Sequence, residues 1–184
     1  DGNRLSFDPQ PLSLPTGGTI GVDGRAGGDI ALTSSGATTV EHAEAANDFT
    51  ANAGSFATGL NSIITGGNID VTSPGAVDLG NSSAGGFVQV SGQSIAFNNI
   101  DAGLSVGLSA DGTAPGSEGI SGGSIAAGGN INLFANSIAL TGTVTGDASF
   151  FAFGTGGAVS VNSAHVAGTI SIFSALDLSG SFGA

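Results

Sequence analysis

A short unit recurs along this chain: two glycines, one variable residue, and then two apolar residues separated by a single position. The copies are GGTIGV (17–22), GGDIAL (27–32), GGNIDV (66–71), GGFVQV (85–90), GGNINL (128–133) and GGAVSV (156–161). An apolar-x-apolar segment places two side chains on one face of a β-strand. Repetition of one small unit is typical of a solenoid, in which each coil buries its apolar face against its neighbours.

A second strand-like segment follows most of these units. The first apolar residues of the two segments are eight positions apart for Ile69 and Val77, and seven apart for Val88 and Ile95. From the second unit to the sixth, the shortest interval, 19 residues, matches one solenoid coil, and the longest, 43 residues, fits two coils with an added loop. The loop is predicted at 111–119, where turn residues are dense and apolar periodicity is absent.

These patterns predict an all-β chain folded as a right-handed parallel β-helix with irregular loop insertions over residues 17–184. A β-sandwich completed by a donated strand is the alternative fold. The glycines at the corners are expected to supply positive φ angles. Asn68 and Asn130, which hold equivalent corner positions, are expected to bond their own backbone and to stack on the next coil.

The predicted core consists of stacked Ile, Val, Leu and Phe side chains, with Phe150, Phe151 and Phe153 marking an aromatic section. One stretch differs from the strand pattern: residues 40–47, VEHAEAAN, are rich in helix formers and predict about two turns of helix.

The segments GGNIDVTSPGAVDLGNSSAGG (66–86) and GGNINLFANSIALTGTVTG (128–146) resemble the repeats of filamentous-haemagglutinin-like exoproteins. The resemblance covers about residues 17–180. It implies a secreted bacterial protein of the two-partner-secretion type with a right-handed β-helix shaft. Because that family includes adhesins, toxin-delivery shafts and matrix components, the resemblance implies an architecture rather than one activity. The chain is short for this family.

Residues 1–16 differ from the rest, because Leu5, Phe7, Leu12 and Leu14 alternate with polar residues while prolines interrupt the run. The segment is predicted to be an N-terminal arm that pairs with a neighbouring subunit, or else a cap strand. The C-terminal sequence remains strand-like without a polar cap. Exposed strand edges invite pairing with another chain, so the two ends together predict a homopolymer joined head to tail.

The charge balance excludes several classes of function. The net charge is −12 with only two cations, Arg4 and Arg25, so binding to nucleic acid is not expected. No apolar run is long enough to cross a membrane, and no membrane insertion is expected. The chain has no cysteine and no methionine, even at position 1, which fits a secreted protein whose signal peptide was removed. The expected location is extracellular or on the cell surface.

Catalytic motifs are missing from the sequence: His42 and His165 stand apart from any recognisable nucleophile or zinc spacing. Asp70 and Asp78 are expected to point outward, where they could act on a neutral glycan only as a pair. Carboxylates in or beside the loop, Asp101, Asp111 and Glu118, are the candidate calcium ligands.

The function predicted from the sequence is structural: a secreted subunit that self-associates end to end into an extracellular fibre or matrix, without enzymatic activity. The alternative is an adhesin shaft fragment that binds surface glycans through its outer face. A polysaccharide-active β-helix enzyme is the third possibility.

Overall fold

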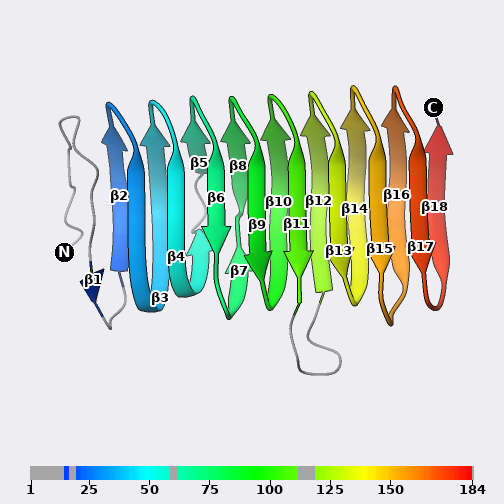
Figure 1. The fold of residues 1–184 in the computed structure, drawn as a ribbon, viewed down its shortest axis with the longest axis horizontal. Helices are drawn as coiled ribbons and strands as arrows, with labels where there is room; N and C mark the ends of the chain where they lie inside the picture. The colour runs from blue at the N-terminus through cyan, green and yellow to red at the C-terminus, as the bar shows by residue number, and fades with distance from the viewer. Residues whose placement is uncertain (1–14, 17–19, 59–61, 112–118, 184) are drawn as a thin grey trace.

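In the computed structural model, the residues described are 15–16, 20–58, 62–111 and 119–183, with side chains described from Arg25 onward. Every regular element in these ranges is a β-strand, and all the strands belong to one 18-stranded sheet. The sheet winds into a solenoid of about eight coils, seen from the side in Figure 1. The predicted β-helix is therefore confirmed, and the β-sandwich alternative is wrong.

The strands are β1 (Pro15–Thr16), β2 (Ile20–Ala26), β3 (Ile30–Ala45), β4 (Phe49–Thr58), β5 (Ser62–Thr65), β6 (Ile69–Thr72), β7 (Ala76–Asp78), β8 (Asn81–Ala84), β9 (Val88–Gly92), β10 (Ser94–Ala102), β11 (Val106–Ala110), β12 (Gly119–Ala127), β13 (Ile131–Ala135), β14 (Ser137–Gly146), β15 (Phe150–Gly154), β16 (Val159–Val166), β17 (Ile170–Ser174) and β18 (Leu178–Gly183).

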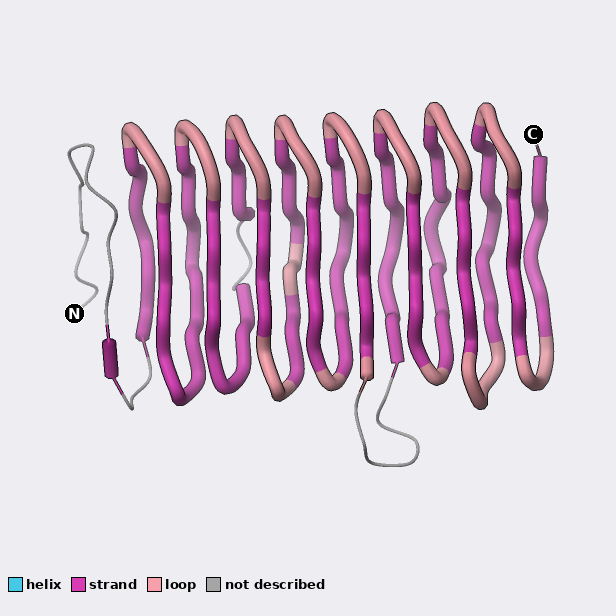
Figure 2. The backbone as a smooth tube through the Cα atoms, in the orientation of Figure 1, coloured by secondary structure: helices cyan, strands magenta, loops and turns pink. Residues whose placement is uncertain are grey.

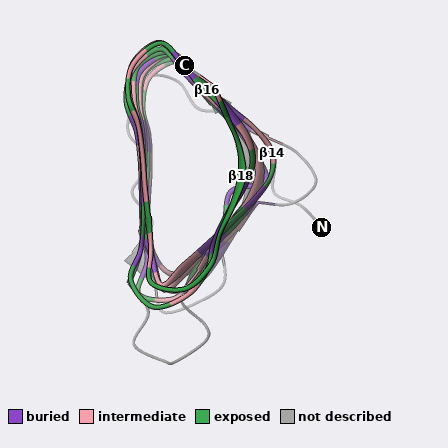
Figure 3. Cartoon of the chain, turned by 90° about the vertical axis from the view of Figure 1, so that its right-hand side faces the viewer, coloured by how far each residue is buried: buried purple, intermediate pink, exposed green. Residues whose placement is uncertain are grey.

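One coil consists of three strand segments, which form three walls. In the coil of residues 69–84, β6 lies in wall A, β7 in wall B and β8 in wall C. Longer strands such as β10 and β14 bend from wall B into wall C without a break. Viewed along the axis, the walls enclose one elongated ring, with wall A as its long straight side (Figure 3).

All the strand pairs are parallel, and each strand between the two end coils of the described structure pairs with strands one coil before and one coil after it. In Figure 1 the front strands run downward and the rear strands upward as the chain advances from left to right, which is a right-handed coil. The tube in Figure 2 shows the same path, with tight turns at the upper corner joining wall C to wall A. Right-handed crossovers are the general rule for parallel strands.

The core is a set of columns that run along the axis. The first inward position of wall A is occupied in successive coils by Ile30, Phe49, Ile69, Val88, Val106, Ile131, Phe150 and Ile170. All but the last are buried. Apolar residues stacked on apolar residues stabilise each coil through its neighbours, since one coil alone has no closed core.

The repeat units predicted from the sequence are not all equivalent. The units at 27–32, 66–71, 85–90 and 128–133 begin strands of wall A, whereas Ile20 and Val159 of the other two units lie in wall B. Coils that begin at Phe49, Val106, Phe150 and Ile170 lack the two-glycine signature. The 43-residue interval does contain two coils, and the predicted loop lies largely outside the described residues, since residues 112–118 are not described.

The helix predicted over residues 40–47 is wrong, because β3 continues as a strand to Ala45. Ala43 and Ala45 are buried and pair in register with Ile63 and Thr65 of the next coil. Stacking between coils fixes the backbone here and overrides a weak local helix propensity.

The prediction that corner glycines supply positive φ is also wrong for the described residues, in which only Gly80 and Gly180 have positive φ. Glycine is needed at such a corner because the backbones of successive coils lie too close together for a side chain. A Cβ on Gly85, for example, would clash with the carbonyl oxygen of Gly66. Asn68 and Asn130 do hold equivalent places. Each of their side chains accepts a backbone N–H of the next coil, from Phe87 and Ser149 respectively, instead of stacking on another asparagine.

Candidate functional site

The last coil of the described structure, formed by β17 and β18, exposes residues from core columns. Leu178 and Phe182 align with the buried Val159 and Ala164 of the preceding coil, yet their exposed fractions are 51% and 41%. Ile170 and Ile172 pack only partly against the core. The side of this coil that faces away from the preceding coil, called here the open side, is therefore an apolar surface with the outline of the solenoid cross-section.

The strands of this last coil lack the charged residues and prolines that deter further strand pairing. β17 reads ISIFS and β18 reads LSGSFG, so neither contains a charged residue or a proline. Natural proteins protect sheet edges with charges, prolines or bulges. The one irregularity is a register shift in the β16–β18 pairing, between Val161 and Ser163.

A second feature is an aromatic cluster on the outer face of wall A, named here the aromatic strip: Phe134, Phe151, Phe153 and Phe173. Three of these residues, Phe134, Phe153 and Phe173, occupy the same outward position in consecutive coils. Their exposed fractions are 45%, 38% and 53%. The prediction that Phe151 and Phe153 belong to the core is wrong, because only Phe150 of that group faces inward.

The rings of the aromatic strip contact one another across coils. The ring of Phe151 lies 5.3 Å from Phe134 and 5.7 Å from Phe173, measured between centroids, with interplanar angles of 40° and 46°. Phe153 stacks on Phe151 at 6.4 Å and meets Phe173 at 6.1 Å. The result is a continuous apolar ridge along the axis whose rings do not share one plane.

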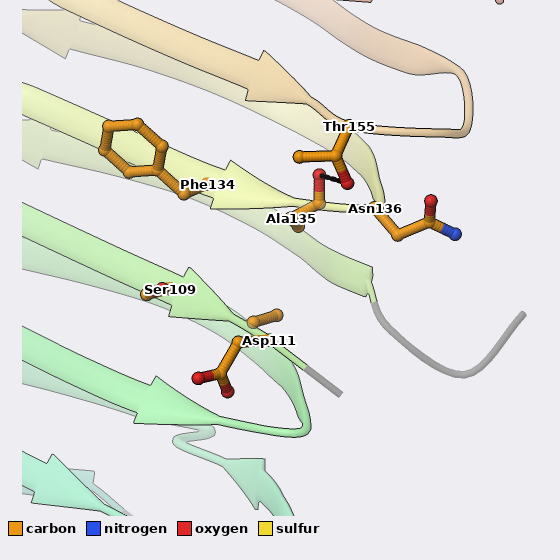
Figure 4. Close-up of a pocket in the computed structure, with 7 residues that line it drawn as sticks. Ser109, Asp111, Phe134, Ala135, Asn136 and Thr155 are labelled. Carbon is orange, nitrogen blue, oxygen red and sulfur yellow. Dashed lines mark hydrogen bonds between the residues drawn. The ribbon is translucent and has the colours of Figure 1, made fainter. Parts of the chain in front are cut away.

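A shallow groove borders the strip at Phe134, beside the corner between walls A and B. In Figure 4 the side chains of Asp111 and Asn136 point in different directions, and the Thr155 hydroxyl donates a hydrogen bond of 3.4 Å to the Ala135 carbonyl. The polar groups therefore do not converge on one point, as a catalytic or metal site would require.

The predicted calcium ligands are not brought together by the described structure. Asp101 is exposed on wall C, in β10, whereas Asp111 follows β11 of wall A. Glu118 lies outside the described residues. Within those residues no group of three or more Asp, Glu, His or Cys side chains is placed to hold a metal ion.

Asp70 and Asp78 point outward, as predicted. Asp70 lies on wall A, paired with Thr50 and Gln89, while Asp78 lies on wall B, paired with Ala57 and Ala96. Carboxylates on different walls do not face a common substrate, so these two residues do not form the pair that a glycan hydrolase needs.

Wall C carries a small charged cluster in the first coils. The Arg25 guanidinium contacts the Glu44 carboxylate at 2.6 and 2.8 Å, and His42 Nε2 lies 3.0 Å from the same carboxylate. The hydrogen bond from His42 and the neighbouring Arg25 hold the pKa of Glu44 below its ordinary value. His165 is exposed on the same wall in a distant coil and lies outside this cluster.

The predicted assembly residues of the N-terminal arm, Leu5, Phe7, Leu12 and Leu14, lie outside the described residues. The end of that segment is described: β1 pairs in parallel with Thr33 and Ser34 of β3.

Comparison of the chain with protein-family models, curated proteins and solved structures found no match. In the part of the chain that the structure describes, no helix has the length and apolarity of a membrane span.

The sequence analysis did not predict the aromatic strip. The sequence does contain a signal for it: phenylalanine recurs at Phe134, Phe153 and Phe173, at offsets of 19 and 20 residues, and each offset equals one coil.

Proposed function

We propose that this protein is a structural solenoid that associates end to end into an extracellular fibre or matrix. The observation that carries the proposal is the open side of the last coil, where Leu178 and Phe182 are exposed in core columns. A further coil is the partner that matches this surface, because it would continue both the hydrogen-bonded ladders and the apolar columns.

The strand edge supports the same proposal. β17 and β18 present backbone groups without charged or proline residues that would deter pairing. A contact between unlike ends of two copies repeats without closing, and so generates a filament. The resemblance to filamentous-haemagglutinin-like repeats accords with a shaft of this kind in a secreted bacterial protein.

The test replaces one exposed core residue of the last coil with an acid. Phe182→Asp places a carboxylate against the next coil, and we expect rods of single-chain length where the unmodified protein forms longer rods by negative-stain electron microscopy. The matched control is Ser179→Asp, which adds the same charge to the same strand at an exposed outward position. We expect it to retain the long rods.

The opposite results are equally clear. Rods of single-chain length for the unmodified protein at every concentration up to about 1 mM would overturn end-to-end association. Long rods from Phe182→Asp would show that the last coil is not the contact. Circular dichroism of each variant confirms that the solenoid remains folded, since β-structure outside the last coil does not depend on Phe182.

A further inference from the structure

We infer that the aromatic strip is a lateral interface that joins two copies of this chain side by side, wall A against wall A. This inference does not rest on end-to-end association, because it uses the outer face of the solenoid and not its end. Phe134, Phe153 and Phe173 are all more than one-third exposed in consecutive coils of a surface that is otherwise mostly polar.

Charge is the first argument for a second copy. With a net charge of −12, two copies repel one another over most of their surfaces. The strands that carry the strip read INLFA, FFAFG and ISIFS, and none contains a charged residue. The strip is therefore a face on which two like-charged solenoids can approach closely. A basic partner would instead be recognised through the acidic residues elsewhere on the surface.

Geometry is the second argument. The strip follows the solenoid axis on the outer face of wall A, which is the straight side of the cross-section in Figure 3, so a two-fold rotation can lay one strip against its copy. Outer faces of flat sheets pack at about 10 Å, with side chains interdigitating. Rings tilted by 40–50° interleave in such a contact. The Phe151 and Phe153 rings are parallel within 5°, but the Phe134 and Phe173 rings are tilted against them, so the four rings do not form one flat surface for a sugar chain.

The available area sets the strength of the contact. The exposed parts of the phenylalanine rings amount to on the order of 300 Å² per copy, given about 200 Å² for one side chain. The two copies together bury about 600 Å² of ring surface, below the roughly 1,600 Å² of a standard stable interface. We therefore expect a reversible dimer with a dissociation constant of about 10–100 μM, which parallel filaments would strengthen through many simultaneous contacts.

The experiment is sedimentation velocity over a concentration series that spans this range, with the double variant Phe153→Ser/Phe173→Ser. We expect the variant to weaken the dimer at least about tenfold. Ile64→Ser is the matched control: it removes a side chain of similar exposure, 42%, from wall C, and should change the dissociation constant less than about twofold. If the double variant unfolds, the single variant Phe173→Ser replaces it, since this ring is the most exposed of the strip.

Electron microscopy separates this inference from end-to-end association. Lateral pairing doubles the width of a rod, whereas end-to-end joining increases its length. Rods of unchanged width at high concentration, or equal widths for the unmodified protein and the double variant, would overturn the inference. A titration with a soluble β-1,4-linked glucose hexamer tests whether the strip binds a glycan. If the unmodified protein binds the hexamer but does not self-associate, and the double variant does not bind it, the strip is a glycan site and the inference is overturned.

Discussion

The side-chain carboxylate of Asp48 accepts the backbone N–H of Asn68 at 2.7 Å, one coil further along the axis. The same relationship recurs at this corner of other coils. Asp29 accepts from Asp48, Asn68 from Phe87, Asn130 from Ser149, and the Ser149 hydroxyl from Thr169. The residue before β3, β4, β6, β13 and β15 thus ties its own coil to the next. This ladder explains why Asp, Asn and Ser accumulate at that position.

The ladder predicts that Asp48→Ala lowers the free energy of unfolding by about 1 kcal/mol, because the N–H of Asn68 loses its acceptor. Asp48→Asn keeps an oxygen at the same place and should cost less. Urea denaturation followed by circular dichroism measures both. Asp147→Ala is the control, since its carboxylate has no hydrogen-bond partner among the described residues, and equal losses for the two alanine variants would contradict the prediction.

Two neighbouring phenylalanines of β15 should differ sharply in their effect on stability. Phe150 is fully buried in a core column, so Phe150→Ala should cost about 3–5 kcal/mol through lost packing and a cavity. Phe153 faces outward, and Phe153→Ala should cost about 1 kcal/mol from lost ring contacts. Thermal or urea unfolding of the two variants tests this. A larger loss for Phe153→Ala than for Phe150→Ala would mean that the register of β15 is shifted by one residue.

One substitution is expected to stabilise the protein. Thr38 is buried, with 1% of its surface exposed, and its hydroxyl has no hydrogen-bond partner among the described residues. Thr38→Val keeps the shape and removes the unpaired hydroxyl, which should raise the unfolding free energy by about 1 kcal/mol. Thr39→Val, one residue on and facing outward, serves as the control and should change stability by less than about 0.5 kcal/mol. A loss of stability in Thr38→Val would refute the assignment.

The Glu44 carboxylate should titrate below its ordinary range, because His42 and Arg25 favour its charged form. A carboxyl whose pKa is lower in the folded state contributes stability that is present above the unfolded pKa. That contribution disappears as the pH falls through the folded pKa. Nuclear magnetic resonance titration of the Glu44 side chain measures the midpoint directly.

We expect His42→Ala and Arg25→Ala each to raise the pKa of Glu44, because each removes a group that favours the charged carboxylate. Because the cluster is accessible to solvent, added salt should reduce the shift in the unmodified protein. A midpoint that stays the same in both variants would show that the contacts do not persist in solution.

Much of the fold was predictable from the sequence, as the coil of β6, β7 and β8 illustrates. The alternation in Ile69-Asp70-Val71 fixes which side chains face inward, and the spacing from Ile69 to Val77 fixes the length of wall A and its corner. The equivalence of Asn68 and Asn130 was also correct. Each of these features depends on residues close together in the chain, where a period of two suffices to assign a face.

The rest depended on partners that lie about one coil away. Residues 40–47 look helical by local propensity, yet residues 40–45 form a strand, in which Ala43 pairs with Ile63. Coils that begin at Phe49 or Val106 lack two glycines and are recognised only by the strands they pair with. Propensity is a weak signal wherever hydrogen bonds and packing come from another coil.

The sequence by itself indicated a parallel solenoid in preference to a β-sandwich, because a short unit of alternating strands recurs along the chain and can bury its apolar residues against neighbouring copies of the unit. The tertiary structure alone decided what the outside of the solenoid presents. Phe150 and Phe153 are three positions apart and therefore lie on opposite faces of β15, and the register of β15 with β13 and β17 decides that Phe150 is the one that faces inward. Register is set by the whole stack of coils, since a slip of one residue would exchange the inner and outer faces of a strand.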